Sequence, residues 1–232
     1  MIDQLLAPGI ASAESFGDPD GLAPLPAEES LIARAVPKRR NEFVTTRHCA
    51  RQALGSLGID PVPILRGDKG QPLWPTSVVG SLTHCDGYRA AVAAYALQVR
   101  SLGIDAEPHE RLPDGVLDHV SLPTERDDLA ARTRDGSDSV QNDASEADPP
   151  VHWDRLLFCA KEATYKAWFP LTGRWLGFED AHITFERTGP GGGTFHSQLL
   201  VDGSTHDGGT PLTEFSGRWL VQRDLILTAI TV

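Results

Sequence analysis

The sequence predicts an α+β protein in which helices and alternating strands follow one another in both halves of the chain. The strongest helical signal covers residues 153–168, where apolar side chains recur at spacings of three and four. The strongest strand signals are the alternation of apolar and polar residues at 101–107 and the short apolar runs within 182–232. Each half therefore runs from helix to sheet, although no residue-level repeat is visible.

Composition and charge restrict the classes of function. The chain has 232 residues, 40% of them hydrophobic and 23% charged, which suits a globular protein with a sizeable core. A net charge of −11 argues against nucleic-acid binding, because phosphate contacts require a basic surface. Three cysteines without CxxC spacing indicate neither a disulfide framework nor a zinc site. The start of the chain lacks the basic region of a signal peptide, and no apolar run is long enough to span a membrane. We therefore expect a cytoplasmic monomer with no membrane or nucleic-acid partner.

The first half is expected to contain one long helix, at 38–57, whose inner side carries Phe43, Thr46, Ala50, Ala53 and Leu54. The other elements expected there are an opening segment Met1–Leu6, a loop up to about residue 30, a helical segment at 28–35 that Pro37 interrupts, a tight loop at 66–74, a strand at 78–85 and a strand or helix start at 90–96.

The second half is expected to contain the helix at 153–168 and a set of antiparallel strands. The other elements expected there are a helical piece at 113–120, a capped helix start at 121–126, and strands at 182–186, 194–201 and 218–232, the last interrupted by Arg223-Asp224. Between these, residues 133–150 lose nearly every large apolar side chain and carry a net charge of −4, from five acidic residues and one arginine. This composition predicts a mobile surface insertion.

Three carboxylates form the main candidate for chemistry. Asp105 and Glu107 lie on one face of the strand at 101–107, with their Cα atoms about 7 Å apart, and could share a hard cation. Glu162 and Lys166 stand one turn apart on the helix at 153–168, with Lys161 adjacent but about 100° around the helix. Two exposed acids are often merely solvated, and a Glu-Lys pair is a common surface feature. Together the three acids favour a magnesium site beside a phosphate.

Cationic residues in the first half are candidates for binding phosphates. Arg40 and Arg47 are seven residues apart and so share a helix face, where they are either solvated or present two guanidinium groups to a polyphosphate. The loop that contains Lys69 and Gly70 has glycines that allow a ligand to approach the backbone closely. His84 lies at the end of a strand, where a single histidine more often has a structural role than a catalytic one.

Two motifs resemble a known family. The sequences G-I-D-A-E at 103–107 and F-C-A-K-E-A-T-Y-K at 158–166 are similar, in residue types and order, to the paired signatures of the Sfp-type 4'-phosphopantetheinyl transferases. The chain looks most like the branch that includes the siderophore-associated and PptT-like enzymes. The resemblance covers about residues 39–178.

The resemblance implies a reaction and a set of roles. The family transfers 4'-phosphopantetheine from coenzyme A to a serine of acyl, aryl or peptidyl carrier proteins, with Mg²⁺, and releases 3',5'-ADP. By similarity, Arg40, Arg47, Lys69, Gly70, Thr83 and His84 would contact the coenzyme, and Asp105, Glu107 and Glu162 would hold the metal. Glu162 would take the proton of the serine, while Lys166 would offset charge on the phosphates.

The family fold implies two similar α+β halves packed as a pseudo-dimer, here residues 1–107 and 108–232. Two other functions stay open on the residues alone. A magnesium-dependent hydrolase of nucleotide pyrophosphates would use the same carboxylates. A noncatalytic coenzyme A-binding module would keep the cationic residues but would need neither Glu162 nor a metal.

Overall fold

The structure, a computed structural model, describes residues 1–135 and 150–232, so most of the predicted acidic insertion lies outside the described residues. The helices are α1 (Glu29–Ile32), α2 (Pro37–Ser56), α3 (Val116–Val120), α4 (Pro123–Asp135) and α5 (Trp153–Thr172), with 3-10 turns η1 (Ile2–Leu5), η2 (Pro26–Glu28) and η3 (Phe178–Asp180). The strands are β1 (Ala11–Ser15), β2 (Leu65–Arg66), β3 (Pro72–Leu73), β4 (Val78–Cys85), β5 (Tyr88–Tyr95), β6 (Leu102–Pro108), β7 (Ala181–Gly189), β8 (Gly192–Leu199), β9 (Glu214–Gln222) and β10 (Leu225–Thr231).

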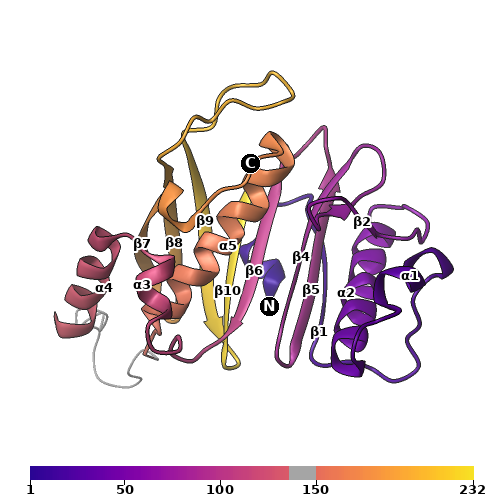
Figure 1. Cartoon of the computed structure of the whole chain (residues 1–232), viewed down its shortest axis with the longest axis horizontal. Helices are drawn as coiled ribbons and strands as arrows, with labels where there is room; N and C mark the ends of the chain where they lie inside the picture. Colours follow the sequence, from indigo (N-terminus) through magenta and orange to yellow (C-terminus); the bar gives the residue numbers. More distant parts are fainter. Residues whose placement is uncertain (136–149) are drawn as a thin grey trace.

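The described residues form a mixed α/β architecture in which each long helix packs on its own antiparallel sheet. Helix α2 covers the three-stranded sheet β1-β5-β4, and α5 covers the β6 and β10 end of the five-stranded sheet β6-β10-β9-β8-β7 (Figure 1). A small hairpin, β2-β3, stands apart from both sheets. Strands β4 and β6 lie side by side where the two sheets meet. The α-helical and β-strand content predicted from the sequence is confirmed.

Helix α5 forms because its apolar stripe is buried along its whole length. Leu156, Leu157 and Trp168, which were predicted to face the core, are at most 1% exposed, and Trp153 is 5% exposed. Burial of each such large side chain stabilises the fold by about 1.5–3 kcal/mol. The helix ends at Gly173, whose φ of 63° is a left-handed conformation that glycine adopts without strain.

One residue on α5 differs from expectation. Lys161, expected about 100° around the helix from Glu162, is only 4% exposed and points into the protein. Its ammonium group pairs with Glu125 of α4 at 2.9 Å and donates to the carbonyl oxygens of Phe178 and Ala181. The expected 100° step between adjacent helical residues places Lys161 against α4 and the start of β7, where its charge is buried.

Helix α2 has the predicted inner side, since Phe43, Thr46, Ala50, Ala53 and Leu54 are all buried. Pro37 is its first residue and does not interrupt a longer helix. A proline is tolerated there because the first turn of a helix has no internal partner for its N–H groups.

Strand β1 lies in a segment that was predicted to be loop. Its five residues, Ala-Ser-Ala-Glu-Ser, pair antiparallel with β5, with Ala13 opposite Ala91. The segment has neither β-branched nor aromatic residues, so its own composition gives no strand signal. The prediction was wrong because the pairing is imposed by the open edge of β5.

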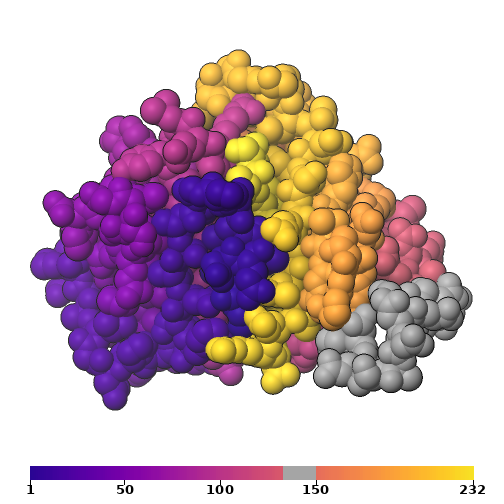
Figure 2. Space-filling model, turned by 180° about the vertical axis from the view of Figure 1, so that it is seen from behind, coloured from indigo at the N-terminus to yellow at the C-terminus, as the bar shows by residue number. Residues whose placement is uncertain are grey.

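The carboxyl-terminal strands form an antiparallel meander, as predicted. The β9-β10 hairpin turns at Arg223 and Asp224, which have φ values of 53° and 56°. Strand β10 then pairs with β6, so that Thr228 lies opposite Asp105. Figure 2 shows the amino-terminal segment lying beside these last strands on the back of the molecule, where Gln4 donates to Gln222. Within the described residues, no helix is long and apolar enough to cross a bilayer.

Candidate functional site

A cavity of about 830 Å³ lies where α2, the β2-β3 hairpin, β4, β6 and α5 come together. It collects side chains that are far apart in the sequence, and most of the predicted site residues are on its walls. Those that line it are Arg47, Lys69, Gly70, Thr83, His84, Asp105, Glu107, Glu162 and Lys166.

Gly103 explains how α5 comes close enough to β6 to build this cavity. A Cβ atom at Gly103 would lie 2.0 Å from the carbonyl oxygen of Ala163 and 2.8 Å from the backbone nitrogen of Ala167. Only glycine therefore lets the helix lie directly on the strand. This contact brings Lys166 of α5 to Asp105 of β6, two residues after Gly103.

One wall of the cavity is cationic. Arg39, Arg47, Arg66 and Lys69 all line it. The guanidinium group of Arg47 stacks on Phe43 at 3.9 Å, and its Nε donates to the carbonyl oxygen of Ile64. Burial lowers the pKa of Arg47 to about 10, so the side chain stays charged at neutral pH. These groups suit a ligand with several phosphates.

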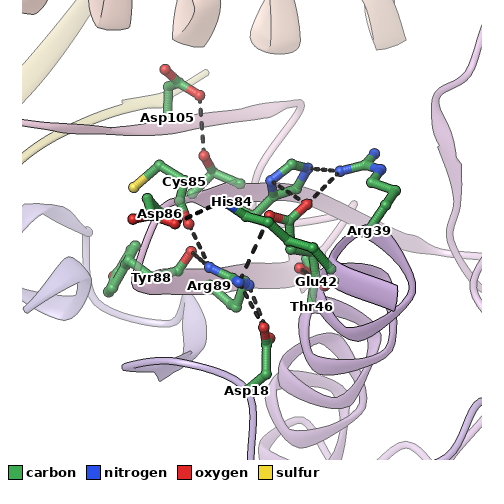
Figure 3. A network of polar contacts seen from close by, with 12 residues as sticks. Asp18, Arg39, Glu42, Thr46, His84, Cys85, Asp86, Tyr88, Arg89 and Asp105 are labelled. Carbon is green, nitrogen blue, oxygen red and sulfur yellow. Dashed lines mark hydrogen bonds and ion pairs between the residues drawn. The ribbon is translucent and has the colours of Figure 1, made fainter. Parts of the chain in front are cut away.

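The structure places Arg39, rather than Arg40, on this wall. Arg40 is exposed and is not among the residues that line the cavity, whereas Arg39 contacts His84 and Glu42 (Figure 3). The spacing of seven residues defines a helix face, but it does not show which sheet residue lies opposite. The position of His84 on β4 decides that Arg39 is the residue that reaches it. The coenzyme contact predicted for Arg40 stays a prediction.

His84 is a neutral side chain in this network. Its Nε2 faces Nη1 of Arg39, and because a guanidinium group only donates, Nε2 accepts. Burial, and then the charge of Arg39, lower the pKa of His84 to about 4. At neutral pH His84 is therefore an uncharged side chain, with its Nδ1 3.9 Å from the carboxylate of Glu42.

The depressed pKa of His84 predicts that stability falls in mild acid. As pH falls below about 6.5, the unfolded chain takes up a proton at His84 that the folded chain does not take up until about pH 4. The free energy of unfolding should therefore decrease over this interval, and His84→Gln should make that decrease shallower. Urea unfolding of both proteins across the interval measures the two slopes. Equal slopes would contradict a buried, neutral His84.

The opposite wall carries the carboxylates. Asp105 is 5% exposed, and its Oδ1 accepts from Lys166 at 2.7 Å and from Thr83 at 3.1 Å. Its Oδ2 is buried without a hydrogen-bond partner among the described residues. Burial would lower the pKa of Lys166, but the charge and hydrogen bond of Asp105 outweigh it and raise that pKa. Lys166 is therefore a charged group at the foot of the cavity.

The other two carboxylates differ in their surroundings. Glu107 is half-buried and accepts from Arg155 of α5 at 2.9 Å. Glu162 is half-buried and has no hydrogen-bond partner in the part of the chain that the structure describes. Burial, followed by the charge of Asp105, raises the pKa of both glutamates above the ordinary value. Glu162 is therefore the carboxylate that is free to act on a ligand.

The carboxylates fit a magnesium ion only in part. Across residues 1–135 and 150–232, no three acidic, histidine or cysteine side chains form a ready-made group of metal ligands. Glu107 forms an ion pair with Arg155, so its carboxylate is not free to bind a metal ion in this arrangement. Magnesium, however, is usually bound by one or two carboxylates together with substrate phosphates. The unpartnered Oδ2 of Asp105 and the free carboxylate of Glu162 meet that requirement.

An aromatic wall was missed by the sequence reasoning. Phe158, Tyr165 and Phe169 of α5 line the cavity beside Glu162, and Trp175 packs on Tyr165 at 5.0 Å between ring centroids. These three residues lie three to seven positions from Glu162 along the helix and therefore on its side. That spacing could have indicated, from the sequence alone, that they line the site. Fold and cavity together define a mixed α/β protein whose site joins a cationic, an acidic and an aromatic wall.

Comparisons with known proteins give the family. A family model described as the 4'-phosphopantetheinyl transferase N-terminal domain matches residues 27–94, and one described as the 4'-phosphopantetheinyl transferase superfamily matches residues 101–208. The chain is 60% identical to 4'-phosphopantetheinyl transferase PptT of Mycobacterium tuberculosis over 96% of this chain and 92% of that protein. It is 57% identical to 4'-phosphopantetheinyl transferase Npt of Nocardia iowensis over 99% of each. Enterobactin synthase component D of Salmonella typhi is 33% identical over 74% of this chain and 65% of that protein. The chain therefore belongs to the 4'-phosphopantetheinyl transferase superfamily, as the two motifs indicated.

Proposed function

We propose that this protein transfers the 4'-phosphopantetheine group of coenzyme A to a serine of acyl, aryl or peptidyl carrier proteins. The observation that carries the proposal is a single cavity that joins several cationic side chains to a free carboxylate, in a chain of this family. Coenzyme A has a 3'-phosphate and a pyrophosphate at one end and an uncharged arm at the other. The cationic wall suits the phosphates, and the aromatic wall suits the arm.

The first half of the chain would hold the coenzyme. Arg39 and Arg47 of α2 present guanidinium groups to the phosphates, and Lys69 adds a charge at the mouth of the cavity. Gly70 has a φ of 90°, a left-handed conformation that favours glycine and keeps the hairpin turn narrow beside the ligand. His84 would donate a hydrogen bond to a phosphate oxygen.

The second half would supply the groups that act during transfer. The serine hydroxyl forms a bond to the β-phosphorus, the bond from that phosphorus to the bridging oxygen breaks, and 3',5'-ADP leaves. Glu162 would take the proton of the serine, and Lys166 would stabilise charge on the phosphates. Asp105 and Glu162 would hold Mg²⁺, with Glu107 nearby, and the bound ion would neutralise the pyrophosphate.

The account predicts that Arg39 and Arg40 differ in their effect on coenzyme binding. Arg39→Ala should weaken coenzyme A about tenfold or more, because a charge-assisted hydrogen bond contributes about 1.5–3 kcal/mol. Arg40→Ala is the matched control and should leave the dissociation constant unchanged, since Arg40 is exposed outside the cavity. Titration calorimetry with coenzyme A measures both. A larger loss for Arg40→Ala than for Arg39→Ala would contradict the assignment.

The organisation of the chain is part of the proposal. The packing of α2 on one sheet and α5 on the other supports two α+β halves in a pseudo-dimer. The pairing of β6 with β10, and the break between the two family matches, favour a boundary before Leu102 rather than after Glu107. We also propose that the chain is a monomer in the cytoplasm; the three free thiols support the reducing compartment.

Two alternatives are separated from transfer by one comparison. The protein is incubated with Mg²⁺ and coenzyme A, with and without a carrier protein, and the remaining coenzyme A is measured. Transfer predicts consumption only with the carrier. A nucleotide pyrophosphate hydrolase would consume coenzyme A without it, and a noncatalytic binding module would consume none in either case.

A further inference from the structure

The seam between the two sheets is bridged by side-chain hydroxyls. Strands β4 and β6 belong to different sheets and have no regular ladder between them. Instead, the N–H of Ile104 donates to Oγ of Ser81, and the N–H of Ala106 donates to Oγ1 of Thr83, both at 3.0 Å. Ser81 and Thr83 are 4% and 3% exposed. These two hydroxyls therefore make equivalent structural contacts.

Thr83 makes a second contact that Ser81 does not make. Its hydroxyl donates to Oδ1 of Asp105 at 3.1 Å. A hydroxyl has one proton, and a carboxylate only accepts, so that proton is committed to Asp105 while a lone pair receives the N–H of Ala106. The hydroxyl of Thr83 thus has no proton left for a coenzyme phosphate, the contact that the family resemblance implies.

The contact fixes the orientation of the Asp105 carboxylate. Oδ1 receives both Thr83 and Lys166, whereas Oδ2 is buried and receives no hydrogen bond from the described residues. A carboxylate that turned about its Cβ–Cγ bond would lose both contacts. The β-branched side chain of Thr83 has few rotamers, so its hydroxyl is itself held in place. The two donors leave Oδ2 as the one carboxylate oxygen of Asp105 without a hydrogen-bond partner among the described residues.

We propose that Thr83 is a positioning residue, which holds Asp105 so that Oδ2 is presented to a divalent cation. The inference rests on the proposed function, in which a cation is bound at this carboxylate. It assigns to Thr83 a role through Asp105, with the coenzyme phosphates left to the cationic wall.

The test compares three variants with the parent protein. Thr83→Val keeps the shape and removes the hydroxyl, Thr83→Ser restores the hydroxyl, and Ser81→Ala removes only the equivalent seam hydrogen bond. Mn²⁺ binding, in the presence of coenzyme A, is measured from the electron paramagnetic resonance signal of the free ion. Melting temperatures report the structural effect of each change, and the Mg²⁺ concentration for half-maximal transfer gives a second readout.

Thr83→Val should weaken Mn²⁺ binding about tenfold, because it removes one hydrogen bond to a charged group. It should raise the Mg²⁺ requirement by a similar factor without changing the Michaelis constant for coenzyme A. Thr83→Ser should behave like the parent protein. Ser81→Ala should lower the melting temperature to an extent similar to Thr83→Val and leave Mn²⁺ binding unchanged.

Two results would overturn the inference and leave Thr83 as a seam contact only. One is that Thr83→Val binds Mn²⁺ as tightly as the parent; the other is that Ser81→Ala loses as much Mn²⁺ affinity as Thr83→Val. A parent protein that binds no Mn²⁺ would overturn it too, because Asp105 would then have no cation to meet. The proposed function fails separately: a parent whose Mn²⁺ binding is weakened by Thr83→Val, but which modifies no carrier protein, would refute transfer and keep the positioning role.

Discussion

Replacement of Glu162 by glutamine is expected to lower the turnover number by about 10²–10⁴-fold, the usual contribution of a general base. Glutamine keeps the size of the side chain but cannot take up the serine proton. The carboxylate lines the cavity and has no hydrogen-bond partner among the described residues, so the substitution breaks no hydrogen bond there. Coenzyme A binding should weaken much less than turnover. Single-turnover kinetics and titration calorimetry measure the two quantities.

The control for this prediction is Glu110→Gln. The Glu110 side chain is 70% exposed, near the same part of the molecule, and does not line the cavity. Turnover should stay at the parental value. If Glu162→Gln turned over as fast as Glu110→Gln, Glu162 would be a neighbour of Lys166 without a catalytic role, and the base would have to be sought elsewhere.

The second large effect concerns stability. Lys161→Met should lower the free energy of unfolding by about 3–5 kcal/mol, the cost of breaking a buried ion pair from one side. The Lys161 and Glu125 side chains are 2% and 1% exposed, and their charged atoms lie 2.9 Å apart. Methionine would leave Glu125 as a buried charge and two carbonyl oxygens without a donor. Urea unfolding, followed by circular dichroism, measures the change.

The same chemical substitution at an exposed pair is the control. Lys38 pairs with Asp86 at 2.9 Å, but these side chains are 68% and 80% exposed, so Lys38→Met should leave the unfolding midpoint nearly unchanged. Adding Glu125→Gln to Lys161→Met should recover part of the loss. Glutamine removes the buried charge, but Leu122 and Ile183 donate to different oxygens of Glu125, and the single oxygen of glutamine can accept from only one of them, so the recovery is partial. A loss as small as that of Lys38→Met would contradict the buried pair.

Much of the fold could be predicted because local sequence and tertiary environment agree. The stripe of α5 specifies both the helix and its buried face, and the structure confirms both. The alternation of β6 specifies the strand, but the face with Gly103 and Asp105 is buried as well, because α5 packs on it. Strand β1 could not be predicted, since its small polar residues become a strand only beside the edge of β5. The burial of Lys161 could not be predicted for a related reason. A helical wheel shows direction, but it does not show that α4 provides a buried glutamate there.

The sequence predicted which residues belong to the site better than it predicted the contacts between them. Nearly all the predicted side chains line one cavity, because the two motifs lie on β6 and α5, which pack directly against each other. The sequence could not show that Arg155 holds Glu107, or that Thr83 and Lys166 share one oxygen of Asp105. The contact of Thr83 depends on how β4 meets β6 across the seam, and those of Arg155 and Lys166 depend on how α5 packs on β6.

The most direct test of the central claim is the intact mass of a carrier protein after incubation with this protein, Mg²⁺ and coenzyme A. A carrier with its acceptor serine replaced by alanine is the control. The account predicts that the carrier gains the mass of one phosphopantetheine group per acceptor serine, and that the alanine carrier gains none. An unmodified carrier, in a reaction where the protein is folded and binds coenzyme A, would contradict it.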